Sequence, residues 1–221
     1  MSKTKRPILQ FTIAVCGLFF VLFGLWSFNQ YQLMSFSLAP RMILRIVTHW
    51  MLFLPPGLLM WVKREKLSAL GFSKEKIIQQ ILIGILLALL MSSVLTVLPI
   101  LLGFKDMISS TTYSQPWQFV YQFVYMIFGV ALAEELVFRG YLFNKLLEIR
   151  NSRWFAIIIS SALFGLFHIL NGNLIQVFST AVVGFIFCIY REKIKGCTLL
   201  SLIVAHGMYD GMIVLWASCL K

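Results

Sequence analysis

Seven apolar runs, separated by short connections, follow one another along this chain. At about 20 residues each, they have the length that a helix needs to cross the hydrocarbon of a bilayer. Because that hydrocarbon offers no water to the backbone, a spanning segment outside a closed barrel must be a helix. The chain is 60% hydrophobic and only 12% charged, so it has too few charges to cover a surface in water. We therefore predict an all-α, polytopic membrane protein of about seven transmembrane helices, over residues 8–28, 42–62, 78–102, 117–138, 154–170, 174–190 and 198–219.

All seven runs are expected to form a single membrane domain over residues 1–221. The first run is longer than the apolar core of a secretory signal and has no small-residue cleavage site after it, so we expect it to remain as a helix. No inverted repeat of the kind found in transporters is evident. Pro55 and Pro56 are expected to interrupt the second helix, because a proline ring breaks the helical hydrogen-bond ladder.

Basic residues are divided unequally between the two ends of the expected bundle. Lys and Arg near the ends of spans stay preferentially on the cytoplasmic side. Of the 19 basic residues, 15 fall in one set of alternate connections, namely 3–6, 63–76, 139–153 and 191–195. We therefore place the amino terminus in the cytoplasm and expect a multi-pass protein of the plasma membrane. The net charge of +11 then reflects topology and contact with anionic membrane lipids, not nucleic-acid binding.

Other polar and sulfur-containing residues within the runs favour structural roles. Cys16, Cys188, Cys197 and Cys219 lie in or near apolar runs without a C-x-x-C pair, and we expect free, buried thiols. A lone intramembrane histidine such as His49 is expected to hydrogen-bond to a neighbouring helix.

Two adjacent carboxylates within a spanning segment indicate a functional site. Glu134 and Glu135 stand in the fourth apolar run, and the chain has only eight acidic residues in all. An ionisable group in hydrocarbon costs several kcal/mol unless it is paired or hydrated. Arg139 follows Glu135 by four residues, which places both on one face of a helix, and we expect the two to pair.

Two further polar pairs have the same helical spacing. Phe164 and His168 are four residues apart in the fifth run, and His206 and Asp210 are four residues apart in the last run. Each pair therefore shares one helix face. Structural hydrogen bonding alone rarely needs two carboxylates, two imidazoles and a further aspartate on three helices, so the pairs favour a catalytic site.

The depth of these groups in the bilayer is consistent with one shared site. At about 1.5 Å of rise per residue, Glu134, His168 and Asp210 would each lie about 22–24 Å from the cytoplasmic ends of their helices. This agreement requires the fourth helix to continue without a break over residues 117–149, which we expect.

The three motifs together resemble those of the CAAX protease and bacteriocin-processing family, also called CPBP or Abi intramembrane proteases. The resemblance includes the order, the spacing and the transmembrane placement of the motifs. It covers about residues 117–215 as a catalytic core, and it leaves residues 1–116 as variable amino-terminal helices. The matching motifs are Glu134-Glu135-x-x-Phe138-Arg139-Gly140, Phe164-x-x-x-His168 and His206-x-x-x-Asp210.

The resemblance implies hydrolysis of a peptide bond within the membrane. Such hydrolysis needs an activated water, stabilisation of the oxyanion and a proton for the leaving amine. Glu134 as general base, with His168 holding the water, would meet the first need. His206 with Asp210 would face the oxyanion. The expected supporting residues are Glu135, Arg139 and Phe164.

The role of Asp210 and the need for a metal stay open. Many relatives carry Asn at this place, and an ionised Asp cannot donate a hydrogen bond to an oxyanion. Asp210 must therefore be protonated, orient His206 or bind a metal. Zinc could be held by nitrogen and oxygen ligands, but no H-E-x-x-H helix is present, and we favour chemistry without a metal. The ligands of such a zinc ion would be Glu134, His168, His206 and Asp210.

The expected substrate is a membrane-associated peptide or a lipidated protein. Eukaryotic relatives remove the last three residues of prenylated proteins, whereas compact bacterial relatives are associated with the maturation of peptides such as bacteriocins and with self-immunity. The alternatives to a protease are a non-catalytic membrane scaffold or immunity protein of the same fold, and a small transporter with a proton relay.

Overall fold

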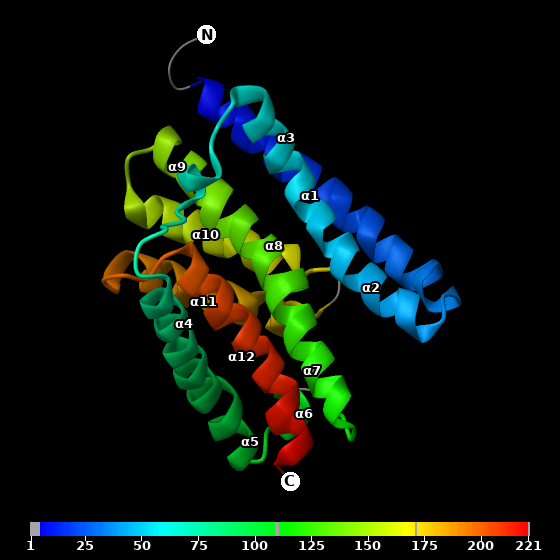
Figure 1. The fold of residues 1–221 in the computed structure, drawn as a ribbon. Coiled ribbons are helices and arrows are strands. Elements are labelled where there is room, and N and C mark those ends of the chain that lie inside the picture. The colour runs from blue at the N-terminus through cyan, green and yellow to red at the C-terminus, as the bar shows by residue number, and fades with distance from the viewer. Residues whose placement is uncertain (1–4, 109–110, 171, 221) are drawn as a thin grey trace.

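The computed structural model describes residues 5–108, 111–170 and 172–220. Every regular element in these ranges is a helix, which confirms the predicted all-α fold (Figure 1). Helix α12 (Leu199–Cys219) packs against α4 (Ile77–Ser92) on one side and, on the other, against the long helix that begins with α7 (Pro116–Val124). Helix α1 (Lys5–Tyr31) runs beside α3 (Leu54–Lys63) at the edge of the bundle.

Six helices in the described residues are long and apolar enough to cross a membrane, one fewer than predicted. Helix α10 (Arg153–Phe167) occupies the fifth apolar run but has only 15 residues. It ends before the predicted limit at residue 170, because the backbone leaves the helical conformation at His168. The six long helices are Lys5–Ser35, Leu38–Lys63, Ile77–Leu101, Pro116–Ile149, Leu174–Lys193 and Leu199–Cys219.

The second span is interrupted where the prolines predicted it. Helix α2 (Leu38–His49) passes into a 3₁₀ turn, η2 (Trp50–Phe53), and α3 then begins with a proline in its first turn. A proline is tolerated there because the first N–H groups of a helix have no intrahelical acceptor. The remaining short elements are η1 (Leu33–Ser35), η3 (Leu67–Leu70), η4 (Ser93–Val97), α5 (Leu98–Leu101) and α6 (Lys105–Ile108).

The fourth span is continuous over residues 116–149, which confirms the predicted unbroken helix. It contains two π-helical segments, η5 (Tyr125–Ala131) and η6 (Leu136–Leu142), and the single α-helical turn α8 (Leu132–Glu135) lies between them. Helix α9 (Phe143–Ile149) completes the span. Such π-helical turns occur frequently at functional sites, and here they flank Glu134 and Glu135 on both sides.

The caps of the last three helices set where each one starts. Ser152 Oγ accepts from the backbone N–H of Phe155 at the start of α10, and Asn173 Oδ1 accepts from that of Gln176 at the start of α11 (Leu174–Lys193). Thr198 forms a capping box with Ser201 at the start of α12. These side chains satisfy N–H groups that a helix leaves open at its first turn.

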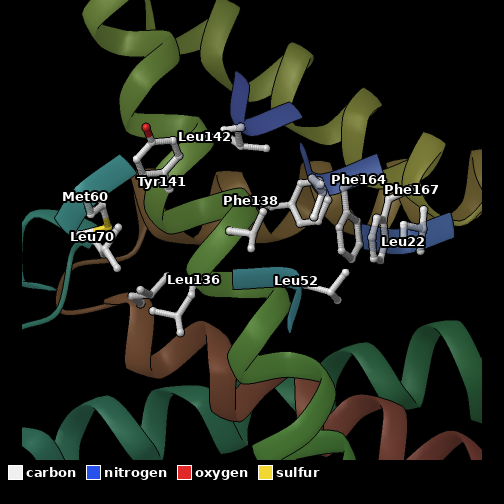
Figure 2. Close-up of a cluster of buried hydrophobic side chains, with 14 of the residues drawn as sticks. Leu22, Leu52, Met60, Leu70, Leu136, Phe138, Tyr141, Leu142, Phe164 and Phe167 are labelled. Atoms are coloured by element: carbon white, nitrogen blue, oxygen red, sulfur yellow. The ribbon is translucent and has the colours of Figure 1, made fainter. Parts of the chain in front are cut away.

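One buried cluster joins the amino-terminal helices to the rest of the bundle (Figure 2). Phe138 of η6 packs edge-on against Phe164 and Phe167 of α10, with ring centroids 5.1 and 5.4 Å apart. Leu22 of α1 and Leu52 of η2 belong to the same cluster. The cluster therefore fixes α10 against the half of the long helix that follows the glutamate pair.

All four cysteines are free, as predicted, but only two of them are buried. Cys188 and Cys197 lie inside the bundle, whereas Cys16 and Cys219 are exposed. The expectation of four buried thiols was wrong because an apolar run does not reveal which face of its helix points away from the protein.

Two glycines allow α12 to approach its neighbours closely. A Cβ atom at Gly207 would lie 2.5 Å from Ile127 Cα in the long helix, and one at Gly84 of α4 would lie 2.6 Å from the carbonyl oxygen of Ser201. Small residues at such crossings let membrane helices pack backbone to backbone. The close approach brings the motif on α12 against the motif on the long helix.

We predict that Gly207→Ala lowers the thermal stability of the purified protein in detergent. The added methyl group collides with backbone, which cannot move aside as a flexible side chain would, and overpacking of this kind costs about 1–3 kcal/mol. Gly24→Ala is the matched control, because a Cβ atom at Gly24 meets nothing within 4 Å. Equal melting temperatures for the two variants would contradict the close packing of α12.

Candidate functional site

A buried carboxylate joins two of the three motifs. Glu135 Oε1 accepts a hydrogen bond from Arg139 Nη1 at 2.9 Å and one from His206 Nδ1 at 2.9 Å. Glu135 and Arg139 are fully buried, and His206 is only 4% exposed. The i,i+4 spacing brings Arg139 to the carboxylate, and the close approach of α12 brings His206. The predicted pair of Glu135 and Arg139 is therefore present, and it also orients the imidazole of His206.

Aromatic rings and a second arginine hold Arg139 in place. Its guanidinium carbon lies 4.1 Å from the ring centroid of Phe164 and 5.5 Å from that of Phe187. A cation over an aromatic face is stabilised by the ring quadrupole, more strongly where water is excluded. Arg191, in the last turn of α11, donates to the backbone carbonyl of Arg139. Phe164 thus contacts the supporting arginine directly.

The second nitrogen of His206 faces two carboxylates. Nε2 lies 3.3 Å from Asp210 Oδ2 and 3.8 Å from Glu134 Oε2. These distances are longer than a strong hydrogen bond to a charged oxygen, which is about 2.7–2.9 Å. Since Nδ1 is committed to Glu135, Nε2 is the nitrogen that can act on a bound molecule.

Glu134 carries a carboxylate oxygen with no hydrogen-bond partner among the described residues, although the imidazole of His206 is nearby. Its side chain is buried, and Oε2 makes no hydrogen bond there. A buried acceptor without a partner is costly and calls for an explanation such as a catalytic role. Glu134 and Glu135 are adjacent in sequence, but only Glu135 is neutralised by an arginine.

His168 stands at the point where α10 ends. Its Nδ1 lies 2.9 Å from the carbonyl oxygen of Phe164, and its ring packs edge-on against Phe164 and Phe167. A proton on Nδ1 leaves the lone pair on Nε2. Within the described ranges, no hydrogen bond or ion pair joins His168 to Glu134 directly.

A cleft of about 860 Å³ reaches this group of residues. His168, His206, Asp210 and Phe164 lie in its wall, so two of the three motifs open into it. The rest of the wall comes from η4, α6, the first half of α11 and α12. These lining residues are Leu95, Thr96, Asp106, Ile108, Asn173, Ile175, Gln176, Phe178, Ser179, Thr180, Val182, Val183, Tyr209 and Ile213.

The site residues do not form a metal-ligand set in this arrangement. Among the described residues, no group of three or more His, Cys, Asp or Glu side chains has a geometry that could hold a metal ion. At this site Nε2 of His206 faces Glu134 and Asp210, but no hydrogen bond or ion pair joins His168 to either carboxylate in the described part of the chain. The alternative zinc set of Glu134, His168, His206 and Asp210 is therefore not assembled around one point in this arrangement.

Sequence reasoning missed two residues that support the site. Phe187 packs against both Arg139 and His206, and Arg191 bonds the backbone of Arg139. Arg191 was counted only as a basic residue of a connection, and Phe187 is one of 20 phenylalanines, so neither carried a distinctive signal. The role predicted for His49 is confirmed, since its Nδ1 lies 3.4 Å from the hydroxyl of Tyr125 on the long helix.

Comparison with known proteins agrees with the motifs. Residues 116–212 match the family model described as type II CAAX prenyl endopeptidase Rce1-like. The matched segment holds all three motifs, and it confirms the resemblance to the CAAX-type membrane proteases. A search of curated proteins and a search of solved structures gave no match.

We predict that Arg139→Gln strongly destabilises the protein. The change leaves Glu135 as a buried charge without its cation, and breaking one side of a buried ion pair costs about 3–5 kcal/mol. Thermal unfolding in detergent measures the effect.

The control for this measurement is Arg153→Gln, which removes an arginine that is 71% exposed and paired with Glu192. An exposed pair contributes about 0–1 kcal/mol, so this variant should unfold close to the wild type. Similar losses in the two variants would contradict the central role of the Glu135–Arg139 pair.

Proposed function

We propose that this protein is an intramembrane endopeptidase that hydrolyses a peptide bond by means of a water activated by Glu134 and His168. The match to the Rce1-like family indicates a CAAX-type membrane protease in general. The observation that carries the finer proposal is the buried, unpartnered Oε2 of Glu134. It lies 3.8 Å from Nε2 of His206, which in turn lines the cleft.

Glu134 is the general base in this proposal. Its free Oε2 accepts a proton from water as the water oxygen attacks the carbonyl carbon of the substrate. His168 positions that water through Nε2, because its Nδ1 is bound to the carbonyl of Phe164. A base placed in this way contributes typically about 10²–10⁴-fold to the rate. The proton held on Glu134 then passes to the leaving amine, so the same carboxyl serves as base and as acid.

His206 stabilises the oxyanion. Its Nδ1–H is bound to Glu135, and the N–H at Nε2 is directed to the space beside Asp210 and Glu134. A donor held in advance at the place where charge develops stabilises the transition state without reorganisation. Asp210 orients His206 by accepting from Nε2 at the long distance of 3.3 Å, so the same N–H is shared with the oxyanion when it forms. This orienting role is the second of the three roles left open by the sequence.

Arg139 gives the two adjacent carboxylates, Glu134 and Glu135, different roles. Because its cation neutralises Glu135, that carboxylate stays fixed as a hydrogen-bond acceptor for His206. Glu134 lacks such a partner and is free for proton transfer. We propose that this chemistry runs without a metal, since no group of three or more ligating side chains among the described residues has a geometry that could hold one.

The substrate in this proposal is a membrane-associated peptide or a lipidated protein, and the enzyme resides in the plasma membrane. The cleft supports this substrate class, because its wall contains many apolar side chains from α11 and η4. The family description names prenyl endopeptidases, and a lipidated tail is consistent with such a wall.

We predict that Glu134→Gln lowers the rate of peptide cleavage by about 10²–10⁴-fold, the range typical of a lost general base. The measurement is cleavage of short apolar and lipidated peptides by the purified protein in detergent, with and without a strong chelator. Activity in chelator that disappears in the variant supports the glutamate chemistry. Loss of wild-type activity in chelator would instead require a metal.

Glu148→Gln is the matched control, because Glu148 is half exposed and pairs with Lys145 away from the cleft. It should cleave at close to the wild-type rate. If Glu134→Gln cleaves as fast as this control, the protease proposal fails and the scaffold alternative gains support.

We predict that Asp210→Asn retains most of the activity, whereas Asp210→Leu loses at least about tenfold. The amide oxygen of Asn can still accept from Nε2 of His206, but Leu has no acceptor. Steady-state cleavage by the two variants distinguishes the orienting role from an acid role. If Asp210 instead acted as an acid, both variants would lose cleavage activity to the same extent.

A further inference from the structure

The cleft is acidic in a strongly basic chain. The chain has 19 basic and eight acidic residues, yet no Lys or Arg is among the described residues that line the cleft. Asp106 and Asp210, the only two aspartates of the chain, both line it. With no Lys or Arg in the described wall and with Asp210 paired to His206, the free carboxylate of Asp106 gives its part of the cleft a negative potential, which concentrates positively charged groups there.

The two aspartates stand at different places in the cleft. Asp210 is partly buried and lies 3.3 Å from His206, so its charge belongs to the reacting groups. Asp106 lies on α6 and is exposed, and no ion pair in the described part of the chain involves it. The neighbouring cation, Lys105, donates to the carbonyl oxygen of Leu220 at 2.6 Å and does not line the cleft. Asp106 is therefore free to attract a cation on a bound molecule.

Much of the cleft wall is apolar, with a few neutral polar groups. Leu95, Val183 and Ile213 provide aliphatic surface. Thr96 is wholly buried and adds one hydroxyl group to this wall. Gln176 and Ser179 add neutral hydrogen-bonding groups. This lining suits a peptide with aliphatic side chains and an exposed backbone.

We propose that the cleft selects an apolar peptide segment that carries a basic side chain, and that Asp106 binds this side chain. The inference rests on the proposed peptidase function and names the substrate class of that site. An acidic side chain at the same position is disfavoured, because Asp106 would repel it.

The size of the selection follows from the exposure of Asp106. An ion pair at an exposed site contributes about 0.2–1 kcal/mol, which corresponds to about a 1.5- to 5-fold preference for a basic over a neutral residue. Repulsion adds to the discrimination when the residue is acidic. The expected wild-type order of cleavage is therefore Lys, then Gln, then Glu.

The experiment uses a set of fluorogenic apolar peptides that differ at one position, which carries Lys, Gln or Glu, with that position scanned along the peptide. The enzyme is the full chain in detergent, as wild type, Asp106→Asn and Asp106→Lys. We expect Asp106→Asn to reduce the ratio of Lys to Glu cleavage toward one and Asp106→Lys to invert it. The control is Glu75→Lys, which makes the same charge change at an exposed residue outside the cleft.

Binding of the same peptides to Glu134→Gln, measured by fluorescence anisotropy, separates the two proposals. If peptides bind with the Lys preference but are not cleaved by the wild type, the selection stands and the peptidase proposal fails. If the Lys preference is absent in both binding and cleavage, or is unchanged in Asp106→Lys, the selection by Asp106 is wrong.

Discussion

The carboxylate of Glu135 is the interaction on which the rest of the site depends. A single oxygen of Glu135 accepts from Arg139 on its own helix and from His206 on α12. It therefore fixes the motif on the long helix with respect to the motif on α12. Both bonds are buried, where charge-assisted hydrogen bonds are strong and an unpaired charge is costly. The glycine contacts of α12 and the aromatic rings around Arg139 keep this group closely packed.

Helical spacing explains how neighbouring glutamates come to have different environments. Arg139 follows Glu135 by four residues, so its guanidinium lies beside Glu135 and not beside Glu134. The carbonyl of Arg139, within the π-helical segment η6, also accepts from Arg191 of α11, which fixes this part of the helix. Two identical side chains thereby become a fixed acceptor and a free one.

Residue spacing predicted the parts of the site that lie within single helices. The Glu135–Arg139 pair and the approach of Asp210 to His206 both follow from i,i+4 periodicity, and the continuous fourth span follows from its length. Contacts between helices could not be predicted, because periodicity does not specify which helices lie side by side. Phe187 and Arg191 were missed for that reason. Six of the about seven predicted spans are helices long enough to cross a membrane, and the fifth is shorter than predicted because hydropathy in that run continues past the residue where α10 ends.

The shortness of α10 has a consequence for the supply of hydrolytic water to the site. Its 15 residues extend over about 22 Å, whereas the hydrocarbon of a bilayer is about 30 Å thick. A membrane adapts to a short hydrophobic helix by thinning locally. His168 lies where α10 ends, and it lines the cleft. We therefore expect the lipid to be thin beside this histidine, which would shorten the path of hydrolytic water through the apolar layer.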